Sequence, residues 1–337
     1  MLSYSFSKLI PGGNPTIILH DPDIPDGTLP GLSARLMHPM HLHAEQVGAL
    51  YSGQAHEWSP DQPDWPLPRL EMMGGEFCVN ATRAAAFCLT RQGSLPRLAM
   101  PEGETPVWHG ALQVSGMAEP VRVLASADAA SLDRAMEMPV SAGGGWKLEG
   151  KPAGTNRMAG EEPARLFCAA LVSCADAVCR QVQKGVSLVD LPGMSHLLVD
   201  MDRHPLPDLD DGSWKRESAA WRTLCGLTDS PASGVVWYKA EGEAYRIWPA
   251  VEVKATASEH LESACGSASL ALALTCAMPR TADAAAPLEN AGEFTVVQPS
   301  GESLRVRLQR EPSSGAFLRT AWISGPVLLA ARGDVFF

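Results

Sequence analysis

Several kinds of sequence signal are missing from this chain of 337 residues, and each absence excludes a class of protein. Lysine and arginine number 27 against 38 acidic residues, the formal net charge is -11, and the basic residues form no run. Because nucleic-acid-binding surfaces are basic, we expect no nucleic-acid partner. No stretch of about 18 apolar residues occurs, so we also expect no membrane-spanning helix and no membrane partner.

Cofactor and zinc motifs are missing as well. No Gly-x-Gly-x-x-Gly follows a predicted strand and no Gly-x-x-x-x-Gly-Lys-Ser/Thr occurs, so we expect no bound cofactor. The eight cysteines include no Cys-x-x-Cys pair of the kind that holds structural zinc. The first residues lack the charged and apolar regions of a signal peptide, which predicts a cytoplasmic protein with reduced cysteines.

Two of the cysteines, Cys78 and Cys265, occur in matching surroundings in opposite halves of the chain. Each thiol comes directly before a small, alanine-rich segment of high helix propensity, over 79–90 and 266–277. A thiolate at a helix N-terminus is stabilised by the helix dipole and by unpaired N–H groups. The pair therefore predicts two thiols that act on opposite faces of one substrate.

The predicted elements repeat along the chain. We expect strands over 15–19, within 106–126, over 195–200 and over 234–238, helices over 79–90, 162–183, 217–224 and 266–277, and a hairpin formed by 294–298 and 304–308. This order predicts an α+β fold of two domains related by a pseudo-twofold axis, each a curved mixed β-sheet or barrel around a central helix. Residues 1–150 carry Cys78 and residues 151–325 carry Cys265; the glycine-rich stretch 141–160 is the predicted linker, and the residues after 325 are expected to return to the first domain.

The motifs around both cysteines resemble those of the diaminopimelate epimerase-like superfamily of cofactor-independent amino-acid racemases and epimerases. The resemblance extends along nearly the whole chain. It is carried by Gly13-Asn14-Pro15-Thr16-Ile17, Phe77-Cys78-Val79-Asn80-Ala81-Thr82-Arg83, Gly193-Met194-Ser195-His196, Ala264-Cys265-Gly266-Ser267-Ala268, and the tail from Gln298-Pro299-Ser300-Gly301 to Ser324-Gly325-Pro326.

Departures from that pattern concern the substrate. Met194 stands where the family has an asparagine, and Val79 stands where it has a glycine. The glutamate and arginine that precede the second cysteine in diaminopimelate epimerases are replaced by Thr256 and Ala257. Without that arginine the distal carboxylate of diaminopimelate loses a bidentate partner. The segments 74–78, 43–48 and 261–263 look closer to the histidine racemases of opine-metallophore pathways.

The resemblance implies racemisation at the α-carbon of a free amino acid, with histidine favoured. Cys78 and Cys265 would be the two bases, and the backbone amides of Val79, Asn80, Gly266 and Ser267 would hold the substrate carboxylate. Family position also implies substrate contacts for Asn14 and His196. His43 and Glu45 are further candidates for substrate contact. Glu262 either caps the second helix or recognises the substrate amine.

Alternatives remain open at this point. The segment His38-Pro39-Met40-His41-Leu42-His43 could ligate zinc in a non-catalytic metal-binding protein, although His41 and His43 are expected to alternate on a strand and the spacing fits no zinc motif. A PhzF-type isomerase shares the fold but generally uses a carboxylate near the chain start. A homodimer is the expected assembly.

Overall fold

The computed structural model describes residues 2–52, 67–138, 164–277, 292–310 and 318–337. These residues form one connected sheet of 16 strands with five helices and a short 3-10 helix, η1 (Lys254–Thr256). The helices are α1 (Leu29–Met37), α2 (Val79–Arg91), α3 (Ala129–Glu137), α4 (Ser213–Leu224) and α5 (Gly266–Ala277). The strands are β1 (Ser3–Pro11), β2 (Thr16–His20), β3 (Gln46–Tyr51), β4 (Arg69–Met72), β5 (Val107–Val114), β6 (Val121–Ser126), β7 (Arg165–Ser173), β8 (Val178–Gln183), β9 (Val186–Leu191), β10 (Met194–Asp200), β11 (Ala232–Glu241), β12 (Ala244–Val253), β13 (Ser258–Leu261), β14 (Glu293–Val297), β15 (Ser303–Arg310) and β16 (Leu318–Phe336).

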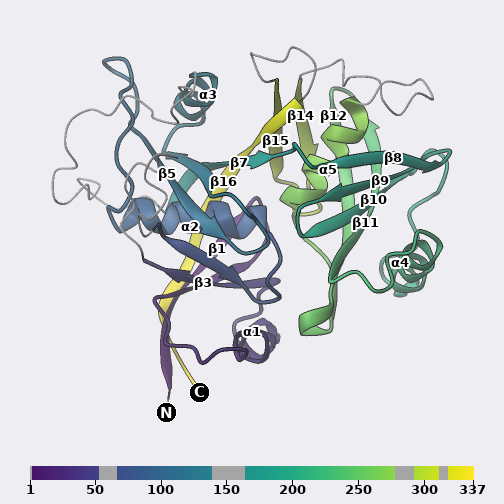
Figure 1. The fold of residues 1–337 in the computed structure, drawn as a ribbon, viewed down its shortest axis with the longest axis horizontal. Helices are drawn as coiled ribbons and strands as arrows, with labels where there is room; N and C mark the ends of the chain where they lie inside the picture. The colour runs from purple at the N-terminus through teal and green to yellow at the C-terminus, as the bar shows by residue number, and fades with distance from the viewer. Residues whose placement is uncertain (1, 53–66, 139–163, 278–291, 311–317) are drawn as a thin grey trace.

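The strands around α2 close into a ring. Strands β1 to β7 are hydrogen-bonded in sequence order, β7 pairs with β16, and β16 pairs back to β1. Figure 1 shows α2 enclosed by these strands, with the N- and C-termini side by side below it. Twelve of the 13 residues of α2 are buried, and four of them are alanine, so the strands enclose the helix on every side.

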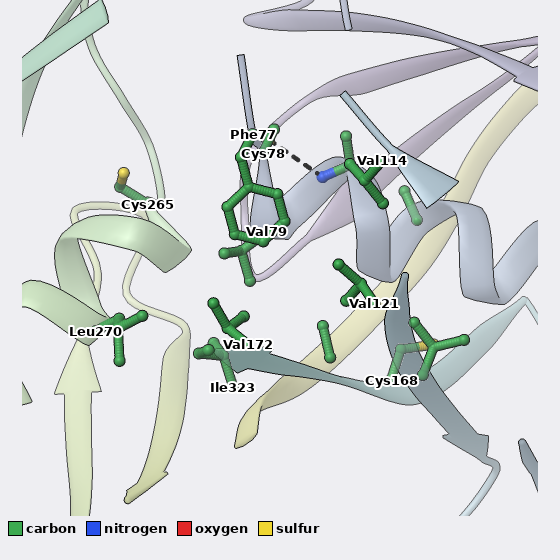
Figure 2. Packing of buried hydrophobic residues seen from close by; sticks show 14 of the residues in the cluster. Phe77, Cys78, Val79, Val114, Val121, Cys168, Val172, Cys265, Leu270 and Ile323 are labelled. Atoms are coloured by element: carbon green, nitrogen blue, oxygen red, sulfur yellow. Dashed lines mark hydrogen bonds between the residues drawn. The ribbon is translucent and has the colours of Figure 1, made fainter. Parts of the chain in front are cut away.

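The second half of the sheet is open. From β16 the order runs β15, β14, β12, β11, β10, β9 and β8, and β8 ends the path without a second neighbour among the described strands. Helix α5 lies against β9, β10, β15 and β16, in the other half of the molecule from α2 (Figure 1). Residues from α2 and α5 share one hydrophobic cluster, so the two halves are joined by a continuous core (Figure 2).

The other helices lie outside the sheet. Helix α1 packs beside β3, α3 covers β5, β6 and β7, and α4 covers β11 and β12. No helix among the described residues is long and apolar enough to cross a bilayer. All eight cysteines lie in the described ranges and are free thiols.

Most of the predicted elements are present. The helices predicted over 79–90 and 266–277 are confirmed as α2 and α5, and the strands predicted over 15–19, 195–200, 234–238, 294–298 and 304–308 correspond to β2, β10, β11, β14 and β15. The helix predicted over 217–224 is α4, which begins at Ser213. The predicted linker 141–160 lies outside the described residues.

The helix predicted over 162–183 is wrong throughout its described residues, which form β7 and β8. In β7, Leu166, Cys168, Ala170 and Val172 are all buried and follow a period of two. Pairing of β7 with β6 and β16 stabilises that extended conformation, which local periodicity does not reveal.

The strand expected at His41 and His43 is also wrong. Residues 38–43 form turns after α1, and His43 has a positive φ of 46°. The amide N–H of His41 donates to the carbonyl of His38, as in a tight turn. The local hydrogen bonds that follow α1 therefore replace strand pairing here.

Candidate active site

Both predicted cysteines lie at helix starts. Cys78 is the N-cap of α2, and its sulfur accepts a hydrogen bond from the N–H of Ala81 at 3.3 Å (Figure 2). Cys265 comes directly before α5, and the backbone amide of Ala268 acts to lower the pKa of its thiol. In each case the amide is three residues after the cysteine. Both thiols therefore lie at helix starts, as expected from the sequence.

The two helix starts touch each other. A Cβ atom built on Gly266 would lie 2.7 Å from Cβ of Val79, which is closer than side chains can pack. Figure 2 shows Cys265 at the start of one helix, facing the start of the other around Phe77, Cys78 and Val79. Glycine at 266 thus permits the close approach that brings both cysteines to one place.

One pocket lies between these helix starts, with about 480 Å³ of empty space, part of it open to solvent. Its lining includes both cysteines and the predicted Glu45, Val79, Asn80, Glu262, Gly266 and Ser267. Residues that were not predicted as site residues also line it: Gln46, Met73, Glu76, Phe77, Met194, Val251, Val253, Ser258 and His260.

Asn14 and Asn80 hold the loop that carries Cys265. Both side-chain amides donate to the carbonyl oxygen of Ala264, at 3.1 and 2.9 Å. Asn14 also donates to Glu45 at 2.7 Å, and it does not appear among the residues of the pocket wall. Asn80 does line the pocket, and the buried guanidinium of Arg83 donates to its Oδ1 at 3.3 Å. These contacts fix the relative position of the two cysteine loops.

His196 lies behind the pocket wall. Its ring is fully buried, and its Nε2 is 2.9 Å from the hydroxyl of Ser267, which is in turn 3.4 Å from the sulfur of Cys265. Burial lowers the pKa of His196 to about 3, so the ring is neutral. A Cβ on Gly234 would lie 2.3 Å from His196 Nδ1, so glycine at 234 makes room for the ring.

His43 is not brought into the pocket. Its side chain is exposed, and its carbonyl accepts a hydrogen bond from Lys8. His38 and His41 lie edge to face nearby. Among the described residues, which include these three histidines, no group of three or more His, Cys, Asp or Glu side chains has the geometry to hold a metal ion.

Three carboxyl groups surround the thiols, and each has a raised pKa. Burial raises the pKa of Glu45 to about 7, although hydrogen bonds from Ser263 oppose the shift. Burial, and then repulsion from Glu45, raises the pKa of Glu262 to about 8. Burial also raises the pKa of Glu76, whose carboxylate accepts from the N–H of Gly74. Such shifts are a common property of catalytic clefts.

The thiols themselves are difficult to ionise when the pocket holds no substrate. Burial is the main reason that the pKa of Cys78 and that of Cys265 lie above the ordinary value. The negative potential of Glu262 raises both further. Hydrogen bonds from the amides of the helix starts act in the opposite direction. A thiolate in this site therefore depends on those amides.

Gln46 and Glu76 were not among the predicted site residues. Gln46 begins β3 and Glu76 lies in the loop before Cys78. Each lies inside a segment that resembles the histidine racemases, 43–48 and 74–78, and that position is the signal that could have identified them.

Comparison with known proteins agrees with this geometry. Residues 3–144 match the family model of the histidine racemase CntK N-terminal domain. A histidine racemase of Fusobacterium nucleatum subsp. nucleatum strain ATCC 25586 is 40% identical over 84 residues, which are 25% of this chain and 26% of that protein. The same enzyme of strain ATCC 23726 matches to the same extent. The matched part is thus about a quarter of the length of these curated relatives.

Solved structures resemble the whole chain. A hydroxyproline epimerase from Agrobacterium vitis with bound trans-4-hydroxy-L-proline has a TM-score of 0.59 at 13% identity, covering 99% of this chain and 91% of that one. A PhzF-family phenazine biosynthesis protein from Bacillus anthracis has a TM-score of 0.56 at 11% identity, covering 100% and 99%. The chain therefore has the mixed α+β fold of these proteins.

Proposed function

We propose that this protein racemises a free amino acid, with histidine as the favoured substrate, and that Cys78 and Cys265 are its two bases. The observation that carries the proposal is that both thiols, each at a helix start, line the same pocket. The family match of residues 3–144 and the similarity to histidine racemases support the choice of substrate.

The reaction removes a weakly acidic α-hydrogen. One cysteine, as the thiolate, takes the α-proton from one face, and the other cysteine, as the thiol, gives a proton to the opposite face. The two roles exchange with the handedness of the substrate. Free N–H groups at the first turns of α2 and α5, from Val79, Gly266 and Ser267, would hold the substrate carboxylate and the negative charge that develops on it.

The carboxyl groups give the pocket an affinity for nitrogen. Glu45 and Glu262 line it and have pKa values of about 7 and 8, close to that of an imidazole, so proton sharing with a histidine side chain or α-ammonium group is favourable. The described residues of the pocket wall include no lysine or arginine. That composition disfavours diaminopimelate, whose second carboxylate needs a cationic partner.

The finer points of architecture belong to the same proposal. We infer two domains related by a pseudo-twofold axis, as in diaminopimelate epimerases, because α2 and α5 are similar helices with one cysteine before each. The C-terminal part of β16 pairs with β1, which fits an N-terminal domain of 1–150 completed by the chain end. We also propose a cytoplasmic homodimer that needs no cofactor.

A PhzF-type isomerase is the second candidate on this fold, since PhzF-family proteins are among the similar structures. The cysteine pair favours the racemase. In a PhzF-type enzyme there would be no reason for both helix starts to carry a thiol.

The proposal is tested with a panel of L-amino acids in deuterium oxide, following the α-hydrogen signal by NMR and the product by chiral chromatography. We expect loss of the α-hydrogen signal and formation of the D-enantiomer with histidine. The double variant Cys78→Ala/Cys265→Ala is the control for exchange that the protein does not catalyse. If no amino acid exchanged above this control, the proposed function would be wrong.

A further inference from the structure

A chain of two hydrogen bonds runs from Cys78 through Gln46 to Glu262, which lies beside Cys265 in the pocket wall. The thiol of Cys78 donates to Oε1 of Gln46 at 2.5 Å, and Nε2 of Gln46 donates to Oε1 of Glu262 at 2.8 Å. The carboxyl group of Glu262 also interacts with the thiol of Cys265. Four side chains from β3, from the starts of α2 and α5 and from the segment after β13 thus form one continuous path.

The side chains of this path are almost entirely buried. The exposed fractions are 9% for Gln46, 5% for Glu262, 7% for Cys78 and 4% for Cys265. Oε2 of Glu262 is buried and makes no hydrogen bond within the described residues, so it has the capacity to bond the neighbouring Cys265 thiol when either group changes its protonation. In such surroundings each donor needs an acceptor on the path itself.

An amide is suited to the middle of this path because it has a donor at one end and an acceptor at the other. In the orientation observed, the oxygen of Gln46 faces Cys78 and accepts from a thiol; it would repel a thiolate. If the amide turned by half a rotation about its Cγ–Cδ bond, its N–H group would face Cys78 and stabilise a thiolate. Its oxygen would then face Glu262 and require a proton there.

We propose that Gln46 is a positioning residue that couples the protonation of Cys78 to that of Cys265. The hydrogen bonds along the path Cys78–Gln46–Glu262–Cys265 can all point in one direction or all in the other, and we call these two arrangements the polarities of the path. The inference rests on the proposed function for its role in turnover, but the coupling itself is a property of the unliganded protein.

In the first polarity, Cys78 is a thiol and donates to Oε1 of Gln46. Nε2 of Gln46 donates to Oε1 of Glu262, whose Oε2 carries a proton and donates to the Cys265 thiolate. In the second polarity, every hydrogen bond is reversed. The Cys265 thiol donates to Oε2 of Glu262, the protonated Oε1 donates to the Gln46 oxygen, and Nε2 donates to the Cys78 thiolate.

The number of protons balances over a turnover. Starting from the first polarity, Cys265 forms an S–H bond with the proton from the α-carbon, and the S–H bond of Cys78 breaks as its proton goes to the other face. Glu262 keeps one proton throughout and only moves it from Oε2 to Oε1. The pKa of about 8 for Glu262 is consistent with a carboxyl group that stays protonated at neutral pH.

Two other carboxyl groups face the path. Glu76 is close enough to Cys78 to raise its pKa, and Glu45 raises that of Glu262. Both act only electrostatically, in either polarity, whereas Gln46 connects Cys78 to Glu262 by hydrogen bonds. The path carries one negative charge, on the thiolate at one of its ends, and either polarity can form. It can therefore serve both enantiomers, as a racemase requires.

The test measures the pKa of the Cys78 thiol from the pH dependence of its alkylation by iodoacetamide, followed by mass spectrometry of the Cys78 peptide. It compares Cys265→Ser with Cys265→Ala. A serine hydroxyl donates to Glu262 as the thiol does, whereas alanine cannot. We expect the pKa of Cys78 to be lower in Cys265→Ser by about one unit, a tenfold difference in thiolate fraction. Adding Gln46→Met should abolish the difference.

Gln298→Met is the matched control, because Gln298 is also a buried amide beside Cys265 but accepts from its backbone N–H, outside the path. We expect the difference to persist there. If Gln46→Met does not fold, Gln46→Asn, whose shorter amide cannot reach both neighbours, should abolish the difference instead. A difference that survived the Gln46 variants, or that was absent with Gln46 in place, would overturn the proposal. Because alkylation requires no turnover, failure of the racemase function would be seen separately, in the exchange assay.

Discussion

The settings of Cys78 and Cys265 agree in one respect and differ in another. Each thiol lies at a helix start, where the amide three residues further on acts to lower its pKa, and burial raises both pKa values. Their second partners differ. Cys78 meets the neutral amide of Gln46, while Cys265 meets the carboxyl group of Glu262 and lies 3.4 Å from the Ser267 hydroxyl. The shared helix start stabilises either thiolate, and the second partner gives each thiol different hydrogen-bonding surroundings.

The sheets around the two cysteine helices differ in a similar way. The strands around α2 form a closed ring, whereas those beside α5 form an open sheet that ends at β8. Helix α2 is therefore held on all sides, and the open sheet leaves α5 as the less constrained partner. We expect changes at the contact between the helix starts to act mainly on the position of α5.

The largest expected effect comes from removing either thiol. If both cysteines are required, Cys78→Ala and Cys265→Ala should each lower kcat for racemisation by about 10³-fold or more, despite their different surroundings. The measurement is the initial rate of D-histidine formation, with circular dichroism to confirm folding. A variant with near wild-type activity would show that its cysteine is only a packing residue.

The second largest effect is expected from changing the contact between the starts of α2 and α5. Gly266→Ala places a Cβ 2.7 Å from Cβ of Val79, which costs about 1–3 kcal/mol of stability and displaces the starts of α2 and α5. A displacement of this kind should lower the racemisation rate by about 10²-fold.

The matched control is Gly31→Ala in α1, where an added Cβ has no neighbour within 4 Å and a helix interior favours alanine. Thermal unfolding of both variants checks the prediction. Equal melting temperatures for Gly266→Ala and wild type would contradict the close approach.

The carboxyl group of Glu262 distinguishes the surroundings of Cys265 from those of Cys78. Its folded pKa of about 8 lies above its ordinary value of 4.5, so between these pH values the folded state holds a proton that the unfolded state releases. Stability is therefore full below pH 4.5 and falls as the pH rises towards 8. We expect the free energy of unfolding to fall by roughly 3–5 kcal/mol over this range.

Glu262→Gln should flatten this dependence, because the amide does not titrate, whereas the exposed Glu302→Gln should leave it as in wild type. The measurement is urea unfolding at pH 5, 6, 7 and 8. Equal slopes for Glu262→Gln and wild type would mean that other groups, such as Glu45, cause the dependence.

Ser267→Ala should have the smallest effect. It removes the hydroxyl between His196 and Cys265 and leaves the buried Nε2 of His196 without that partner, at a cost of about 1–3 kcal/mol. Because Cys265 keeps its helix-start amide, we expect kcat to fall less than in Gly266→Ala. A loss as large as that of Cys265→Ala would make the hydroxyl part of the chemistry.

Much of the site was predictable because its signals are local. A cysteine before an alanine-rich segment predicts a helix start from propensity alone, and both α2 and α5 are confirmed. The remainder depends on contacts between distant residues. The apolar residues of 164–183 are compatible with both the helical and the strand period. Pairing of β7 with β6 and β16 stabilises the extended conformation.

The roles of individual polar residues were harder to predict for the same reason. Asn14 and Asn80 are predicted to touch substrate, and the sequence did not show that both also hold the carbonyl of Ala264, which lies far away in sequence. Gln46 gave no signal of its own, since its partners Cys78 and Glu262 come from other parts of the chain. Spacing within a motif does not specify such contacts.

The most direct measurement of the two-base mechanism uses wild-type protein with L-histidine in deuterium oxide, stopped after a few per cent of conversion. The two enantiomers are separated and their α-deuterium is measured by mass spectrometry. With two bases on opposite faces, the D-histidine formed carries deuterium from the solvent while the recovered L-histidine keeps its α-hydrogen. Deuterium that appeared in recovered L-histidine as fast as in D-histidine would contradict a mechanism with two cysteine bases.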